Sequence, residues 1–420
     1  MNKNIKLAVA GAVLALSASA NAGIIIPAGE WTLDINGNVN AFAIWNKADH
    51  TNVITGGTAS TKDVAGEKNT QGINTGLLPS WLGFTGKTRQ NDLDVEFTIS
   101  IQPGVSSNHV HGDQGSTSTA NGDSTNILNR QTYVSFGDKS WGSMKLGKDL
   151  GIYASDAILN DMTLLGVGGV ANTSGAAWTG SGSLTTIGGI GTGYHYAAWK
   201  GQIAYTTPNF NGFQATLGIT NPNQGLVNSG VTGATNNLYQ DRHGLEGKAS
   251  YSFSGDAVTG KVWVSGASYK TKLGDGAQAT TFESTATAAD IGANANFGGF
   301  GLTGYYYTGD GVGTTALFVQ SHDAAGRKRD SDGGYVQATY VLPTKTKVGI
   351  AYGKSNLDLT AGETQNSIVV SHNKRMTVGA YHPLTKHLNL VAEYNDVESE
   401  AHSGIKNENS TISTGAILFF

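Results

Sequence analysis

Residues that could perform catalysis or bind a metal ion form few complete patterns in this chain. His109 and His111 have the spacing of two metal ligands, but they stand in a Ser/Thr/Gly-rich stretch with no third ligand in view. Glycine clusters at 166–169 and 188–193 resemble phosphate-binding loops, yet neither lies between a predicted strand and a predicted helix. The patterns G-x-S-x-G and H-E-x-x-H are absent from the sequence. The sequence therefore predicts no enzyme, no cofactor and no metal site.

A long loop with acidic residues follows a predicted hairpin at 129–148. This loop is rich in Gly, Ser and Thr, is about forty residues long and carries Asp156 and Asp161. A loop of this length is uncommon in a compact soluble domain. We interpret it as a loop that folds into the interior of a wide barrel.

The first 22 residues have the pattern of a cleaved signal peptide. Lys3 and Lys6 precede the apolar run Leu7–Leu16, and Ala20-Asn21-Ala22 forms an A-x-A cleavage signal. The apolar run is too short to span a bilayer as a helix. We therefore expect a mature chain that begins at Gly23 and is exported.

Composition narrows the class of protein further. Without residues 1–22, 25 basic and 31 acidic residues give a net charge of −6, which argues against a nucleic-acid partner. There is no cysteine, hence no disulfide framework. Hydrophobic residues make up 39% and no later apolar run approaches 18 residues, which excludes a helical membrane protein. A transmembrane β-barrel has this profile because lipid-facing and lumen-facing residues alternate, but a secreted β-sandwich or β-solenoid shares it.

Alternating hydrophobicity favours the barrel. In the segment Glu30–Lys47, apolar residues from Trp31 to Trp45 fall on one face, with a tryptophan near each end, as expected for aromatic girdles at two membrane surfaces. In Leu93–Gln102, the polar face carries Asp94 and Glu96. Two carboxylates on one face are costly in a dry core and cheap beside water. The pattern indicates a wet interior.

The same rhythm continues to the C-terminus and predicts about sixteen antiparallel strands joined alternately by short turns and long loops. A sandwich has no reason to sort its loops by length, whereas a membrane barrel has short periplasmic turns and long outer loops. The last strand ends on Phe420 and must close against the first one to leave no edge in lipid. We expect a single barrel domain over residues 23–420. The predicted strands are Glu30–Lys47, Trp81–Arg89, Leu93–Gln102, Asn129–Phe136, Ser143–Lys148, Tyr194–Thr206, Gly212–Thr220, Arg242–Phe253, Val258–Thr271, Ala288–Phe297, Phe300–Thr308, Gly334–Leu342, Lys345–Ser355, His372–Tyr381, Leu388–Asp396 and Ser410–Phe420.

Several blocks carry a resemblance to the trimeric general porins of Gram-negative outer membranes. The stretch Ser80–Gly86 (SWLGFTG) is similar to the second-strand block of that family, and Arg130–Phe136 with Met144–Lys148 (MKLGK) resembles the strands that lead into its constriction loop. The stretch Gln202–Phe213 (QIAYTTPNFNGF) is similar to a turn of the family, and the terminal aromatic resembles its assembly signal. The likeness covers essentially the whole mature chain.

This resemblance implies a sixteen-strand barrel in the cell outer membrane, assembled as a homotrimer, whose third loop folds inward and narrows a water-filled pore. In the family, acidic residues of that loop face basic residues of the wall, and the resulting field orients polar solutes. The implied partners are small hydrophilic solutes, ions and outer-membrane lipid. By the same likeness, Arg130 matches a wall arginine and Asp161 a loop acid, and Asp156 and Lys148 are further candidates for the constriction.

Three more residues complete the predicted pore constriction. Lys87 and Arg89 alternate with Phe84 and Gly86 and are expected to point inward near a turn. Trp81 stands where many porins have a wall arginine, so it either lines the pore or, if the register differs by one residue, belongs to a girdle. No glutamate occurs at 163–165, so the constriction should be less charged and more apolar than in the general porins. A surface position for Arg130 and a solvated-loop position for Asp156 and Asp161 are the plainer alternatives.

The predicted function is a porin for passive diffusion of small hydrophilic solutes, with no energy source. Two alternatives remain open at the level of sequence. A substrate-selective channel with a saturable site at the constriction is suggested by Trp81 and the leucines at 164–165. A non-channel barrel acting in adhesion is suggested by the long low-complexity loops.

Overall fold

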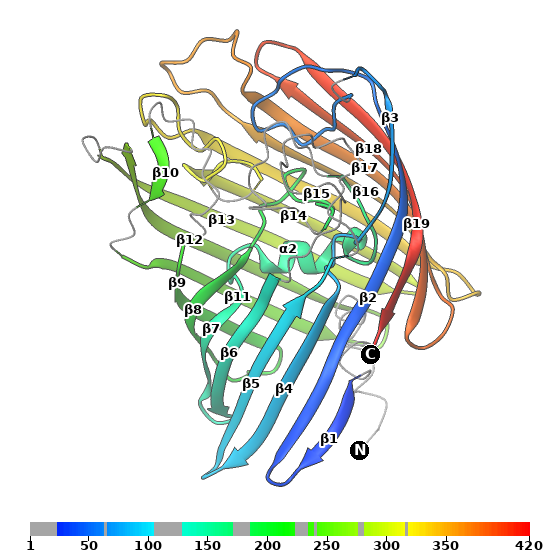
Figure 1. Ribbon diagram of the computed structural model, residues 1–420. Coiled ribbons are helices and arrows are strands. Elements are labelled where there is room, and N and C mark those ends of the chain that lie inside the picture. Colours follow the sequence, from blue (N-terminus) through cyan, green and yellow to red (C-terminus); the bar gives the residue numbers. More distant parts are fainter. Residues whose placement is uncertain are drawn as a thin grey trace.

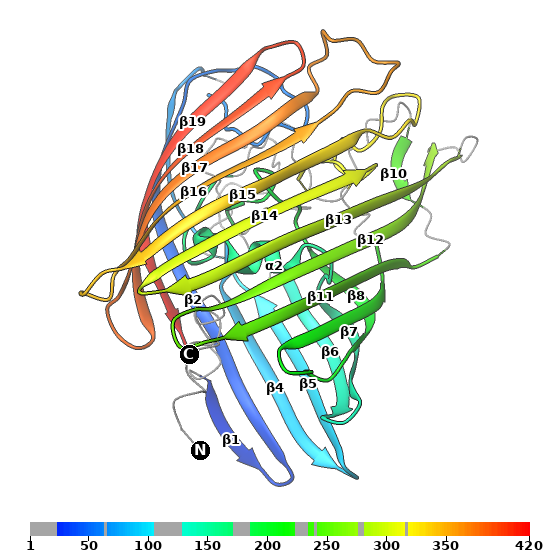
Figure 2. The same ribbon diagram turned by 180° about the vertical axis from the view of Figure 1, so that it is seen from behind.

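Long antiparallel strands close into one ring around a lumen that contains a short helix (Figures 1 and 2). The computed structural model describes residues 23–62, 65–104, 128–170, 185–222, 234–238, 242–275, 281–315 and 318–420. The predicted signal peptide and the His109/His111 pair lie outside these residues. Within them, no helix has the length and apolar character needed to cross a membrane.

Sixteen places make up the ring within the described residues, and each is filled by a strand hydrogen-bonded to its neighbours in sequence order. β3 and β4 pair with different halves of β2 and so share one place. β1 pairs with the start of β2, and β10 pairs with the end of β12, both as additions to the ring. The strands are β1 (Ile24–Ala28), β2 (Trp31–Ala48), β3 (Asn69–Asn74), β4 (Trp81–Gln90), β5 (Leu93–Gln102), β6 (Leu128–Asp138), β7 (Gly142–Leu150), β8 (Trp199–Thr206), β9 (Phe213–Thr220), β10 (Ala234–Leu238), β11 (Gly244–Ser254), β12 (Thr259–Asp275), β13 (Thr281–Phe297), β14 (Phe300–Asp310), β15 (Asp330–Val341), β16 (Lys347–Leu357), β17 (Val370–Pro383), β18 (Leu388–Ala401) and β19 (Lys406–Phe419).

Closure of the ring joins the two ends of the chain. β19 pairs with β2 from Phe419 opposite Asn38 to Asn409 opposite Ala48, so the last strand has no free edge. An unpaired backbone edge in hydrocarbon would be costly, which is why membrane-spanning sheets close. The predicted closed barrel is confirmed, and the sandwich and solenoid alternatives are excluded.

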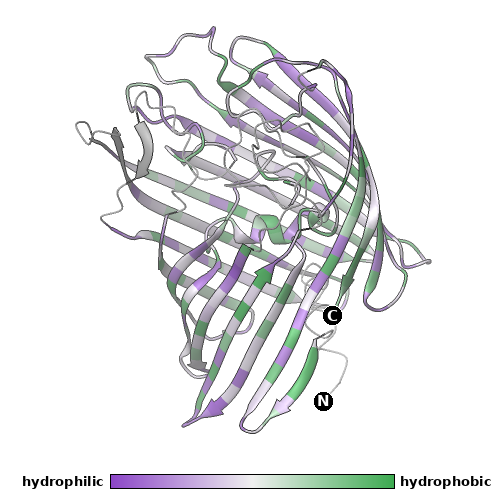
Figure 3. Cartoon of the chain, viewed as in Figure 1, coloured by the Kyte–Doolittle hydropathy of each residue, from purple (hydrophilic) through white to green (hydrophobic). Residues whose placement is uncertain are grey.

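The alternation of side chains also agrees with the sequence pattern (Figure 3). On β2, Val39 is 60% exposed and Trp45 43% exposed on the outer face, whereas Asn38, Asn40 and Asn46 are buried on the inner face. Tight turns such as 91–92 and 298–299 join strands at one end of the ring, and long loops join them at the other (Figure 1). In the predicted orientation the tight turns are periplasmic.

Several predicted boundaries were wrong. Residues 194–198 belong to the long loop that follows β7, and β8 begins only at Trp199. β3 lies between the predicted strands Glu30–Lys47 and Trp81–Arg89, where no strand was predicted, and β1 and β10 were not predicted either. β13 starts seven residues before the predicted Ala288, at Thr281. Polar Ser/Thr/Ala sequence carries no strong period, so cross-strand pairing rather than propensity extends these strands.

Three loops fold into the lumen from the end with long loops. The long loop between β7 and β8, residues 151–198, is called loop three here; it carries the short helix α2 (Ser155–Asn160) and the 3-10 turn η3 (Met162–Leu165). The loop 49–68 lies on the inner wall, where the backbone N–H of Thr58 donates to Ser399 Oγ at 2.9 Å. The loop 311–329 meets loop three, because the N–H of Tyr196 donates to the Thr315 carbonyl at 2.9 Å.

The lumen is thus partly filled by an apolar core. Buried residues of loop three, among them Ile158, Met162 and Leu165, pack against inward aromatic side chains of the wall such as Tyr335 and Trp263. Burial of apolar surface is the main favourable term in such packing. Loop three is therefore a packed element of the barrel interior.

Candidate functional site

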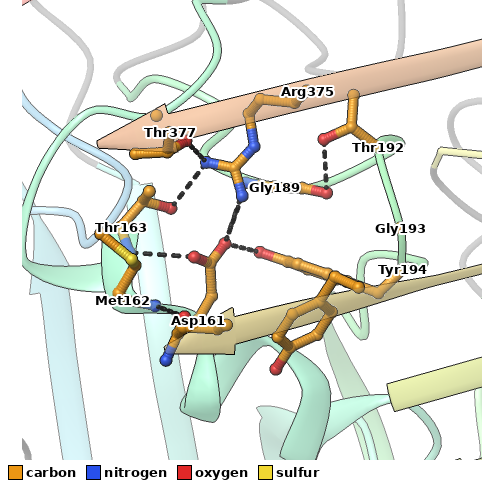
Figure 4. Close-up of polar contacts among 12 residues, drawn as sticks. Asp161, Met162, Thr163, Gly189, Thr192, Gly193, Tyr194, Arg375 and Thr377 are labelled. Atoms are coloured by element: carbon orange, nitrogen blue, oxygen red, sulfur yellow. Dashed lines mark hydrogen bonds and ion pairs between the residues drawn. The ribbon is translucent and has the colours of Figure 1, made fainter. Parts of the chain in front are cut away.

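Asp161 ties loop three to the wall at the junction of α2 and η3. As the residue that caps η3, it accepts the backbone N–H of Thr163 on Oδ1 at 2.9 Å. Its Oδ2 accepts the Gly189 N–H at 3.0 Å and the Tyr194 hydroxyl at 2.8 Å, and lies 3.5 Å from Nη2 of Arg375 on β17 (Figure 4). The Asp161 side chain is only 1% exposed. The predicted loop acid is therefore a buried fastener that joins two turns of loop three to β17.

Asp156, in the first turn of α2, contacts the wall on the other side. It lies 2.9 Å from Lys248 Nζ on β11 and also pairs with Lys261 on β12. Burial alone would raise the pKa of this loop carboxyl, but the two ammonium groups outweigh burial and hold the pKa of Asp156 below its ordinary value. The expected field between loop acids and a distant basic wall is replaced by direct ion pairs.

Two wall glutamates hold the backbone of loop three. Glu246 on β11 is fully buried; it accepts the N–H groups of Ile152 and Tyr153 at 2.7 and 2.8 Å, and Lys200 Nζ lies 2.8 Å away. Glu393 on β18 accepts the N–H groups of Val167 and Gly168 at 2.9 and 2.8 Å. A carboxylate facing two backbone N–H groups satisfies donors that would otherwise be buried without partners.

Arg130 faces the lumen because of a β-bulge. Ser100 pairs with Gln131 and the next residue, Ile101, pairs with Asn129, so Arg130 is the extra residue on β6. Strict alternation would have put Arg130 on the outer face with Val134 and Phe136, which are 40% and 36% exposed. The bulge turns it to the inner face, beside Gln131.

Two tryptophans enclose the Arg130 guanidinium. Its Cζ lies 4.4 Å from the ring centroid of Trp81 and 4.2 Å from that of Trp199. Nη1 donates to Gln131 Oε1 at 3.0 Å, and no carboxylate of the described residues lies within ion-pair distance. Trp81 points inward but is only 8% exposed and packs edge-on against Phe419. Trp81 therefore packs between Arg130 and Phe419 on the inner face, and the predicted alternative that places Trp81 in an aromatic girdle is wrong.

The other predicted residues divide between the two faces of the wall. Lys87 and Arg89 point inward near the tight turn, where Lys87 lies 3.4 Å from Glu96 and Arg89 lies 2.7 Å from Asp94 and 3.1 Å from Asp138. Lys148 stands opposite Thr132 on the outer face and donates to the Asn129 carbonyl at 2.6 Å. Its predicted place in the constriction is wrong, since one step along a strand reverses the face.

Sequence reasoning missed the wall residues that fasten loop three. Arg375, Lys248, Lys261, Glu246 and Glu393 all lie on the inward, polar faces of strands that were predicted. Their charge and inward direction could have been read from alternation. Their partners could not, because each contact joins residues far apart in the chain, such as Asp161 and Arg375.

The arrangement leaves space on both sides of loop three toward the tight turns. A recess of about 800 Å³ lies along β4–β7 and is lined by Lys87, Arg89 and their carboxylate partners. A second recess of about 330 Å³ lies under η3 and along β13–β18. Chemically, the site has polar walls and a fixed obstruction. It can select solutes by size, charge and polarity.

Closure, outward apolar residues and an inward-folded loop define an outer-membrane channel barrel. The family model described as Gram-negative porin matches residues 7–402, and the chain belongs to this family. It is an outer-membrane porin. No curated protein was found to match the chain.

Solved structures with the same fold include several outer-membrane proteins. The outer-membrane channel DcaP of Acinetobacter baumannii is 16% identical, with 95% of this chain and 100% of that chain covered and a TM-score of 0.67. OprB of Pseudomonas putida is 10% identical, with 92% and 94% covered and a TM-score of 0.56. A trimer form of OmpT of Vibrio cholerae is 12% identical, with 93% and 99% covered and a TM-score of 0.51. At these identities the likeness concerns the fold.

Proposed function

We propose that this porin forms a water-filled channel for the passive diffusion of small hydrophilic solutes and ions. The observation that carries the proposal is a closed ring with polar inward side chains whose lumen is narrowed by a loop fixed to the wall. A rigid obstruction in a wet lumen sets a size limit without an energy source. Export through a cleaved signal peptide and assembly as a homotrimer belong to the same proposal; the trimer form of OmpT has this fold.

Single-channel recording of the refolded mature protein in a planar bilayer tests the proposal. The expected result is stepwise conductance in groups of three, one step for each subunit. Folded, heat-modifiable protein that gives no steps would refute the channel and favour the adhesion alternative.

Arg130 and Lys148 provide a matched pair for locating the filter. We propose that Arg130, which lies on the inner face without a carboxylate partner, raises the relative permeability of anions. In a salt gradient, Arg130→Gln is expected to move the reversal potential toward cation preference. Lys148→Gln removes the same charge from the outer face and should leave the potential unchanged. Equal shifts in both variants would contradict the assignment of Arg130 to the pore.

Saturable transport is the second candidate function. It is favoured by one observation, the recess under η3, whose polar side chains are only partly engaged with the rest of the protein.

A further inference from the structure

The recess under η3 differs from the rest of the inner wall in its charge. The wall strands β13–β18 contribute neutral polar residues to its lining, among them Asn296, Thr339 and Asn389, and loop three contributes apolar ones, among them Leu159, Met162 and Leu164. Asp161, also on its border, is engaged by Arg375 and Tyr194. The volume of about 330 Å³ is at the lower end of the range found for small-molecule sites, about 300–1,000 Å³.

Two lysines border this recess, Lys345 in the exposed turn before β16 and Lys347 on β16 itself. Lys347 lies on the inner face of β16, directly opposite Tyr381 of β17, and its Nζ is 5.2 Å from the Tyr381 ring centroid. Among the described residues, Lys347 has no carboxylate within ion-pair distance and makes no side-chain hydrogen bond. The other inward lysines named above, such as Lys87, Lys200 and Lys248, all contact a carboxylate. Lys347 is therefore the exception.

Neutral donors and acceptors accompany this cation. The side chains of Asn296 on β13 and Asn389 on β18 border the recess and make no hydrogen bond within the described part of the chain. By contrast, Asn294 and Gln337 are occupied: Asn294 Nδ2 donates to Asn160 Oδ1 at 2.6 Å, and Gln337 Oε1 accepts the Met162 N–H at 2.7 Å. The recess thus contains polar side chains that hold loop three by hydrogen bonds. It also contains polar side chains that make no hydrogen bond within the described part of the chain.

A glycine and a flexible methionine lie next to Lys347. Gly349, two residues along on the same inner face, has no side chain, and a Cβ at this position would lie 3.2 Å from Cε of Met162. Met162 therefore approaches the wall backbone directly above the lysine. A thioether and leucine side chains form an adaptable apolar surface that suits a flat hydrocarbon group.

We propose that this recess binds small organic anions that carry one carboxylate or phosphate on an apolar or aromatic body. Lys347 pairs with the anionic group, and the body lies against Met162 and Leu164. The inference rests on the proposed channel function and names the solute class that the pore retains in passing. A charged hydrogen bond between the anion and the lysine supplies the discrimination against neutral analogues.

Binding can be measured without conduction, by calorimetric titration of the folded, detergent-solubilised protein. Benzoate and phenyl phosphate serve as anionic probes, and benzamide as the neutral isostere of benzoate. We expect both anions to bind and benzamide to bind at least tenfold more weakly, the scale of a lost charge-assisted hydrogen bond. Preference for only one of the anions identifies the source chemistry and still supports the site. Equal affinity for benzoate and benzamide would overturn it.

Variants assign the binding to this recess. Lys347→Gln should weaken benzoate binding about tenfold and Lys347→Arg should retain it. Lys386→Gln, which removes the same charge from the exposed turn between β17 and β18, should have no effect. Equal weakening in the Lys347 and Lys386 variants would overturn the site in favour of a general field. Heat-modifiable mobility on gels checks that each variant is folded.

The two proposals fail in different ways. If benzoate binding depends on Lys347 but the protein shows no conductance, the channel proposal is refuted and the binding site is supported. If the protein conducts but does not bind benzoate, the binding site is refuted and the channel proposal is supported.

Discussion

Two lysine–glutamate pairs on the inner wall differ in everything except their chemistry. Lys200 and Glu246 lie 2.8 Å apart with side chains 2% and 0% exposed, under the start of loop three. Lys87 and Glu96 lie 3.4 Å apart with side chains 57% and 29% exposed, in the wide recess along β4–β7. Glu246 of the first pair also accepts two backbone N–H groups of loop three, whereas the second pair faces water.

The comparison shows that burial, and not charge, distinguishes a wall pair that fastens loop three from a wall pair that stands in the wide recess. A buried ion pair cannot be broken without leaving a desolvated charge, so it fixes structure. An exposed ion pair is screened and contributes little to stability, but its charges remain available to passing ions. The wall along β11–β18 holds the loop by buried contacts, and the wall along β4–β7 carries exposed charges in the wide recess.

The largest expected effect comes from breaking the buried pair. Glu246→Ala leaves Lys200 charged and unpaired and leaves the N–H groups of Ile152 and Tyr153 without an acceptor, a loss of about 3–5 kcal/mol in the free energy of unfolding. Glu96→Ala, the matched change in the exposed pair, should cost less than about 1 kcal/mol. Urea unfolding in detergent micelles measures both. Similar losses in the two variants would remove the distinction between the two pairs.

Acid should lower the free energy of unfolding through the buried side chain of His195 in loop three. This side chain is fully buried; Tyr153 Oη lies 3.1 Å from Nδ1, and the Gly313 carbonyl lies 2.7 Å from Nε2. Burial lowers the pKa of His195 from 6.5 to about 4. Between these values the unfolded chain binds the extra proton, so stability is lost as the pH falls from 6.5 toward 4, by up to about 3 kcal/mol.

His195→Gln isolates this contribution. The variant should show a smaller fall in the urea midpoint between pH 6.5 and pH 4 than the unmodified protein. An identical pH dependence in the two proteins would mean that His195 is not the group responsible.

A smaller and more local effect is expected at Asp161. Asp161→Ala removes the acceptor for the Gly189 N–H and the Tyr194 hydroxyl, whereas Arg375 keeps its hydrogen bond to Thr377, so the expected loss is about 1–3 kcal/mol in the free energy of unfolding. Glu246 and Glu393 still hold the two flanks of loop three, so the loop should fluctuate at η3 without leaving the wall. In single-channel recordings we expect larger current noise from this variant, at unchanged stability of the proposed trimer. Unchanged current noise would argue against Asp161 as a residue that holds loop three to the wall.

The smallest effect on stability is expected at Arg89, whose ion pairs with Asp94 and Asp138 are exposed. Arg89→Gln should leave the urea midpoint unchanged and shift the reversal potential toward cation preference. A lowered midpoint with an unchanged potential would group Arg89 with the residues that fasten loop three and so reverse the comparison.

Much of the fold could be predicted because barrel strands obey a local rule. Side chains alternate between lipid and lumen, so Val39 and Trp45 could be assigned to the outer face and Asn38 and Asn40 to the inner face from the sequence. The rule places Lys148 on the outer face, as the structure does; its predicted role in the constriction came from the family resemblance and not from alternation. The rule failed for residues 194–198, which continue the strand pattern but belong to loop three.

The candidate site was predictable only in part. The sequence indicated that Asp156 and Asp161 lie on an inward loop and that Arg130 faces the lumen. It did not indicate that both acids are consumed by contacts with β11, β12 and β17, because these contacts join residues that the chain separates by many strands. Nor could it supply the bulge that brings Arg130 inward, since one extra residue on β6 has meaning only against its partner β5.

The sequence by itself determined an export signal pattern, a strand rhythm with short and long connections, and the polarity of each strand face. These follow from local chemistry, because each residue must suit lipid, water or a turn wherever the neighbouring strands lie. The tertiary structure alone decided which charges are neutralised and which stay available. Lys200 and Lys347 are the same residue type on inward faces, but closure of the ring brings Glu246 to Lys200 and brings no carboxylate of the described residues to Lys347. The distance between charges is a property of the closed barrel, and it neutralises one lysine and leaves the other without a carboxylate partner among the described residues.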